Sequence, residues 1–154
     1  MNTKYIIIII CLLGSLTAFA QNKLFDKYAD MDNVTSVYIS KAMFQMMPKV
    51  ETTGLNLMNM QGKIESLQIV STSREDQIPQ MRKEFSQLVK SGHSELMRVR
   101  DGKTRATFYA NMNGEKVNDL LMLADTDSSY TVIQLIGNFT LQDIQEITKD
   151  MEVK

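Results

Sequence analysis

The feature that most restricts the fold of this chain is a run of short apolar segments between Glu95 and Ile136, separated by turn signals. Asp101-Gly102 and Asn113-Gly114 are typical of the two-residue turns that join neighbouring strands of a β-hairpin. The stretch from Asp125 to Ser129 predicts a third, looser turn. Strands joined by turns this short pair in antiparallel fashion. The segment therefore predicts a four-strand antiparallel meander.

Two more strands and several helices are expected outside the meander. β-Branched and aromatic residues predict strands at 34–39 and 64–71, each followed by a helix, at 41–47 and between Ser73 and Gly92. Apolar spacing predicts a short helix at 22–31, and a capping box predicts that the last helix begins after Thr140. Strands followed by helices can join by crossovers. We expect an α+β domain with a mostly antiparallel sheet, made of two crossover-connected strands and the four-strand meander, and with helices packed on one face.

The first twenty residues have the pattern of a secretory signal peptide. Lys4 precedes an apolar run that begins at Tyr5, and Ala18-Phe19-Ala20 suits a signal peptidase. The apolar stretch is shorter than the roughly 20 residues that span a membrane. We expect cleavage after Ala20, with an uncleaved N-terminal anchor as the alternative. Residues 21–154 then form a single domain in the periplasm or cell envelope, with no transmembrane span.

Cleavage also removes Cys11, the only cysteine of the sequence. The exported domain then has no disulfide, no cysteine zinc site and no cysteine nucleophile. The loss of Lys4 reduces the 17 Lys and Arg residues to 16, against 18 Asp and Glu. This mildly acidic balance gives no reason to expect a nucleic-acid partner. Phosphate-binding glycine motifs do not occur, and we expect no cofactor.

Two segments resemble a known bacterial family. The first runs from Val37 to Met43, with Ser40-Lys41-Ala42-Met43, and continues to Met46-Met47-Pro48. The second comprises Leu120 to Leu123 followed by Val132 to Ile144, which contains Gly137-Asn138-Phe139-Thr140. They are similar to a family of exported proteins labelled domain of unknown function 4252. The resemblance covers essentially the whole chain after residue 20. It implies a small exported protein of a double-membraned cell, and it brings no activity, substrate or catalytic residue.

The predicted first hairpin of the meander contains four positively charged residues on one face. A two-residue turn places Arg100 opposite Lys103. It also places Arg98 opposite Arg105, and strand alternation puts Tyr109 on the same face. Like charges opposite one another are destabilising, so something is expected to compensate them. One interpretation is a solvated face with acids nearby, and the other is a site for an anion, an acidic glycan or a lipid headgroup, where Tyr109 adds a stacking surface.

Methionine is unusually frequent in one part of the sequence. The cluster comprises Met43, Met46, Met47, Met58 and Met60. Thioethers are soft ligands that select Cu(I), which makes copper binding one hypothesis. The alternative is that flexible methionines fill the core beneath the sheet, and the shared helical face of Met43, Met46 and Met47 favours it.

The sequence shows no set of side chains in the pattern of a known catalytic site. His93, the only histidine, lies in a polar turn where we expect it to be exposed. An envelope hydrolase using His93 with a carboxylate ranks behind the copper hypothesis, because no positioned nucleophile is evident. The leading hypothesis is a non-enzymatic module that binds an envelope protein or a small anionic ligand through its sheet or the basic hairpin. The apolar segment from Val117 to Leu123 predicts either a central strand or a homodimer surface.

Overall fold

A computed structural model describes residues 23–47, 51–52, 55–60 and 62–149. The predicted signal peptide lies outside these residues. The helices are a segment at residues 23–29, α2 (Lys41–Met46), α3 (Ile78–Lys90) and α4 (Leu141–Thr148). The strands are β1 (Val34–Ser40), β2 (Glu51–Thr52), β3 (Leu55–Asn56), β4 (Ile64–Thr72), β5 (Ser94–Asp101), β6 (Thr104–Asn113), β7 (Lys116–Asp125) and β8 (Tyr130–Thr140).

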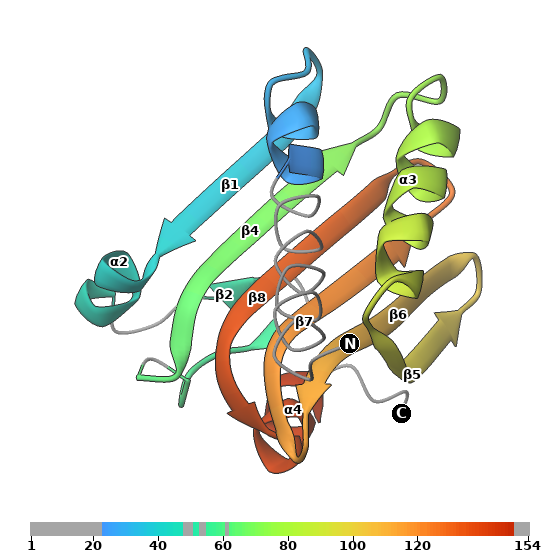
Figure 1. Ribbon diagram of the computed structural model, residues 1–154. Coiled ribbons are helices and arrows are strands. Elements are labelled where there is room, and N and C mark those ends of the chain that lie inside the picture. Colours follow the sequence, from blue (N-terminus) through green and yellow to red (C-terminus); the bar gives the residue numbers. More distant parts are fainter. Residues whose placement is uncertain (1–22, 48–50, 53–54, 61, 150–154) are drawn as a thin grey trace, which may run out of the picture.

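Six strands form one sheet in the order β1-β4-β8-β7-β6-β5, and every neighbouring pair is antiparallel (Figure 1). The predicted α+β class and the predicted meander, β5 to β8, are confirmed. α3 provides a crossover that carries the chain from β4 to the far edge of the sheet. β1 and β4 are instead direct antiparallel neighbours. In the order of the chain, β1 and β4 are separated by a β2–β3 hairpin that the sequence pattern did not indicate.

Helix ends follow the local sequence. α3 begins at Ile78 with Pro79 in its first turn, where the missing N–H of proline costs no helical hydrogen bond. α4 begins after Thr140, whose side chain accepts from the Asp143 N–H at 3.1 Å. The Asp143 carboxylate accepts in return from the Thr140 N–H at 2.8 Å, which completes the predicted capping box.

Helices cover both faces of the sheet, which differs from the expectation of a single covered face. On one side, the α4 face, the sheet packs against Phe44 of α2, Leu55 of β3, and Ile144 and Ile147 of α4. On the other side, the α3 face, it packs against Phe25 and Tyr28 of the 23–29 helix and Ile78, Met81, Phe85 and Val89 of α3. The physical reason is that the central strands are apolar on both sides, and each side needs its own cover.

The segment from Val117 to Leu123 shows this two-sided burial most clearly. It belongs to β7, which lies between β6 and β8. Leu120 and Met122 join the core on the α4 face, whereas Leu121 and Leu123 join the core on the α3 face. The central-strand interpretation is therefore correct, and both faces of this segment are occupied within the domain.

The β5–β6 hairpin turns one residue later than predicted. Asp101 pairs with Thr104 and Arg100 pairs with Arg105, so the loop is Gly102-Lys103. Gly102 has φ +58°, which matches glycine at the first loop position of a type II′ turn. The predicted loop would have required a positive φ at Asp101, which remains in the strand. This shift changes which cations lie opposite one another.

Candidate functional site

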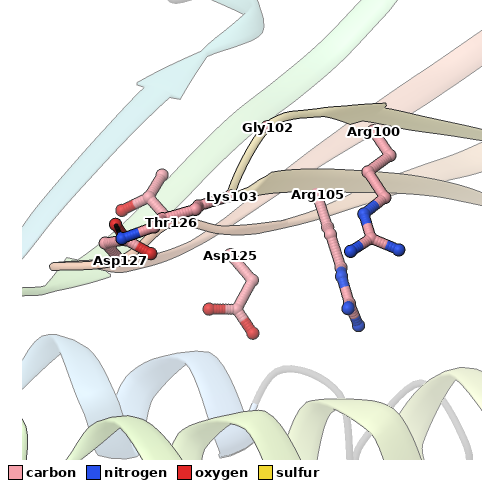
Figure 2. A pocket seen from close by; sticks show the side chains of 7 residues that line it. All are labelled: Arg100, Gly102, Lys103, Arg105, Asp125, Thr126 and Asp127. Atoms are coloured by element: carbon pink, nitrogen blue, oxygen red, sulfur yellow. Dashed lines mark ion pairs between the residues drawn. The ribbon is translucent and has the colours of Figure 1, made fainter.

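A pocket of about 400 Å³ lies at the tip of the β5–β6 hairpin, next to the β7–β8 turn. It is lined by Arg100, Gly102, Lys103, Arg105, Asp125, Thr126 and Asp127 (Figure 2). The hairpin supplies the cations, whereas the end of β7 supplies Asp125 and the β7–β8 turn supplies Asp127. Sequence reasoning identified the three cations and treated the acids only as turn residues.

Arg100 and Arg105 are direct cross-strand partners in β5 and β6. Both are exposed, and their side chains extend side by side from the same face of the sheet (Figure 2). Among the described residues, neither guanidinium makes a hydrogen bond or an ion pair. Two like charges held this close are unfavourable unless a counter-charge approaches them. The pair therefore supplies two unsatisfied, fork-shaped sets of donors for an anion.

Asp125, the acidic residue that lies opposite this arginine pair in the sheet, already has a hydrogen-bond partner. Asp125 lies opposite Arg105 in the β6–β7 ladder. Its carboxylate accepts two hydrogen bonds from Arg82 of α3, from Nε at 2.6 Å and from Nη2 at 3.0 Å. Hydrogen bonding to Asp125 raises the pKa of Arg82. The helix thus supplies a partner for Asp125 that leaves Arg105 without one.

The loop cation has a partner of its own. Lys103 Nζ lies 2.8 Å from Asp127 Oδ2, and both side chains are exposed. Thr126 shapes the turn that carries Asp127, because its hydroxyl oxygen accepts from the N–H of Ser129 at 2.9 Å. An exposed pair of this kind is weak, so Lys103 remains able to contribute to an incoming anion.

Two of the predicted binding residues lie outside the pocket. Arg98 donates to Glu95 at 2.8 Å, and this hydrogen bond raises the pKa of Arg98. Arg98 lies opposite Thr107 in the ladder, so the predicted pairing with Arg105 is wrong. Tyr109 is half-buried and packs against the core of the α3 face. The structure therefore brings together Arg100, Lys103 and Arg105 and separates them from Arg98 and Tyr109.

Comparison with known families bears on the whole domain. A family model described as Domain of unknown function (DUF4252) matches residues 28–147. The chain belongs to the DUF4252 family. Curated proteins and solved structures give no match. The matched residues contain the complete sheet and the pocket, so this site lies within the DUF4252 domain.

The methionine cluster does not occupy a single environment in this DUF4252 domain. Met60 is buried in the core and Met47 packs against it, which agrees with the core-filling interpretation for these two. Met43, Met46 and Met58 are exposed. Phe44, and not a methionine, is the buried residue of α2. Copper binding stays a prediction, and the exposed methionines need another explanation than core filling.

The His93 side chain is buried in the DUF4252 domain, contrary to the expectation of an exposed turn residue. Its side chain is 6% exposed, and its Nε2 lies 3.0 Å from Asp119 Oδ2. The Gln134 amide also donates to Asp119, at 3.3 Å. His93 Nδ1 is buried without a hydrogen-bond partner among the described residues. The burial limits access of a substrate, and the geometry favours a structural link between the end of α3 and β7.

The described residues contain no grouping of three or more His, Cys, Asp and Glu side chains suited to a metal ion. None of their helices combines the length and the hydropathy that crossing a membrane requires.

Proposed function

We propose that this DUF4252 protein is a non-enzymatic, exported module of the bacterial periplasm or envelope that binds an anionic group at the hairpin pocket. The anion belongs to a small ligand or to the surface of an envelope partner. One observation carries the proposal: Arg100 and Arg105 lie side by side, exposed, without an acidic partner among the described residues. The engagement of Asp125 by Arg82 supports it, because it keeps the nearest carboxylate from neutralising the pair.

The chemistry of the pocket favours an oxyanion. Guanidinium groups donate paired hydrogen bonds that match the geometry of carboxylates and phosphates. The pocket is open and its cations are exposed, so a phosphate, a carboxylate or an acidic headgroup at the end of a larger molecule can enter. The export proposal rests on the sequence pattern of residues 1–20.

The binding proposal is tested by titrating the protein with inorganic phosphate and following by NMR the arginine side-chain signals and the backbone amide signals of Gly102, Lys103 and Thr126, which remain in every variant. Phosphate is expected to shift the Arg100 and Arg105 signals. The double substitution Arg100→Glu with Arg105→Glu is expected to weaken binding at least tenfold, since each charge-assisted hydrogen bond contributes about 1.5–3 kcal/mol. Circular dichroism checks that the fold is retained.

A matched control separates local binding from net charge. Lys23→Glu with Lys116→Glu makes the same change in charge at exposed positions that do not line the pocket. This control is expected to bind phosphate nearly as well as the unaltered protein. Equal weakening by both double variants would remove the pocket as the site.

Native mass spectrometry of the protein released from the envelope of its own cell tests the export proposal and searches for the natural ligand. A chain that begins at Gln21 is expected, and an added organic mass would identify the class of anion. A mass that still includes residues 1–20 would contradict cleavage.

A further inference from the structure

The two edges of the six-stranded sheet differ in how they are protected. β5 carries Glu95, Arg98, Arg100 and Asp101, and its pairing with β6 has an irregularity between Glu95 and Met97. Charges and bulges on an edge strand oppose pairing with another sheet. β1, at the opposite edge, has no charged residue and no proline in its seven positions. All seven pair with β4 in an unbroken register, so β1 presents a regular, unprotected edge.

Exposed apolar side chains concentrate beside the β1 edge. Val37 is 38% exposed and Tyr38 is 65% exposed in β1, and they lie on opposite faces of the sheet. In the adjoining α2, Met43 is 48% exposed and Met46 is 78% exposed. Only two other large apolar side chains of the described residues are exposed, Met58 and Leu141. Exposed apolar side chains gathered beside a free strand edge are typical of contact surfaces.

We propose that β1 pairs antiparallel with β1 of a second copy of this chain, about a two-fold axis at Val37. This register uses all seven strand residues, with Val37 opposite Val37 of the second copy. Tyr38 then lies opposite Ser36 of the second copy, and the small serine leaves room for the ring. A two-fold interface of this type is self-complementary by construction.

Charge complementarity at the ends of β1 favours a second copy over an unrelated strand. Asp32 precedes the strand and Lys41 follows it, and both side chains are exposed. Lys41 Nζ lies 3.3 Å from Glu65 Oε1 within the same copy, and an exposed pair of this kind is weak enough for Lys41 to interact with Asp32 as well. The antiparallel register brings Asp32 of one copy toward Lys41 of the other, at both ends of the shared ladder. The exposed Met43 and Met46 belong to α2, which begins at Lys41, so they lie near the same end of the shared ladder.

The proposed β1–β1 pairing limits the assembly to two copies. Two six-stranded sheets joined at β1 form one continuous sheet whose two outer edges are both β5. Those edges keep their charges and their irregular pairing, which oppose further addition of strands. The expected assembly is therefore a dimer and not an open fibre.

A cysteine at the axis tests the register. The test variant is the full chain with the substitutions Cys11→Ser and Val37→Cys, so that residue 37 carries the only thiol. Directly opposed residues of antiparallel strands have Cα atoms about 4.5–5.5 Å apart, within the range of a disulfide. Mild oxidation is expected to convert most of the folded protein into a covalent dimer, measured by non-reducing gel electrophoresis and intact mass.

The matched control places the thiol on the same strand and the same face. Thr35→Cys, again with Cys11→Ser, lies opposite Ile39 of the second copy, so the two thiols are separated by about 13 Å along the strands. This variant is expected to stay uncrosslinked. Equal crosslinking at positions 35 and 37, or none at 37, would overturn the proposed register.

A second variant tests the dimer without a covalent bond. Val37→Asp places two carboxylates against each other at the axis, while Val99→Asp puts the same charge in the middle of β5. Sedimentation velocity over a wide concentration range is expected to show a dimer for the unaltered chain and for Val99→Asp, and a monomer for Val37→Asp. A monomeric unaltered chain, including one whose β1 binds a different protein, would overturn the proposal.

Discussion

Gly137 illustrates how a single residue of the sheet depends on a distant part of the chain. A Cβ at this position would lie 2.1 Å from the carbonyl oxygen of Lys63 and 2.6 Å from the Phe139 ring. The close approach is needed because the Asn138 N–H donates to that same carbonyl at 2.9 Å. Sequence reasoning noted Gly137 only within a family-like segment. Its physical role depends on the backbone of the turn before β4, which no local pattern can indicate.

The substitution Gly137→Ala is expected to destabilise the domain, because neither the backbone carbonyl nor the packed ring can move away easily. Overpacking of this kind costs about 1–3 kcal/mol in the free energy of unfolding. Gly92→Ala is the control, since a Cβ there meets no atom within 4 Å. Denaturant unfolding monitored by circular dichroism measures both variants. Equal midpoints for the two would show that the turn before β4 relaxes around the methyl group.

At the scale of elements, α3 connects the sheet core to the proposed anion site. Its buried side packs against the 23–29 helix, with the Phe85 and Phe25 ring centroids 5.1 Å apart. Its exposed side presents Arg82, which engages Asp125 and lies 5.8 Å from the Tyr130 ring centroid. Burial raises the pKa of Tyr130, with the Asp125 charge as a further cause. The helix thus controls the charge balance of a pocket that it does not line.

Removal of the Arg82 side chain is expected to weaken phosphate binding several-fold, although Arg82 does not line the pocket. In Arg82→Ala, Asp125 loses its partner and becomes able to pair with Arg105, which lies opposite it in the ladder. Lys83→Ala removes the same charge from a neighbouring exposed position of α3 and serves as the control. The phosphate titration described above measures both. Unchanged affinity in Arg82→Ala would mean that Asp125 does not regulate the pair.

At the scale of the whole molecule, the strands at the centre of the sheet are better protected from local opening than the strands at its edges. β7 and β8 have strand neighbours on both sides and a helical layer over each face. β1 and β5 each have one strand neighbour. Local opening is easiest where buried contacts are few, so the edges of the sheet are expected to open before its centre.

Amide hydrogen exchange followed by mass spectrometry is expected to show the slowest exchange in β7 and β8 and the fastest strand exchange in β5. In β1, the rate is expected to fall as protein concentration rises, because pairing with a second copy protects the free edge. Val37→Asp removes that concentration dependence and serves as the control. Faster exchange in β7 than in β5 would contradict the protection expected from this sheet order.

Local patterns in the sequence determined much of this fold. The meander and the Thr140 capping box were both predicted, because turn residues and caps act on neighbours a few positions away. The three cations of the pocket were also identified in this way. The pairing of Arg100 with Arg105 follows from the local turn at Gly102-Lys103, which the sequence pattern had placed one residue earlier. Tertiary structure alone decided the sheet order and the covering of both faces. It also decided that Arg82 engages Asp125, since this contact joins a helix to a strand that the chain reaches only after two hairpins.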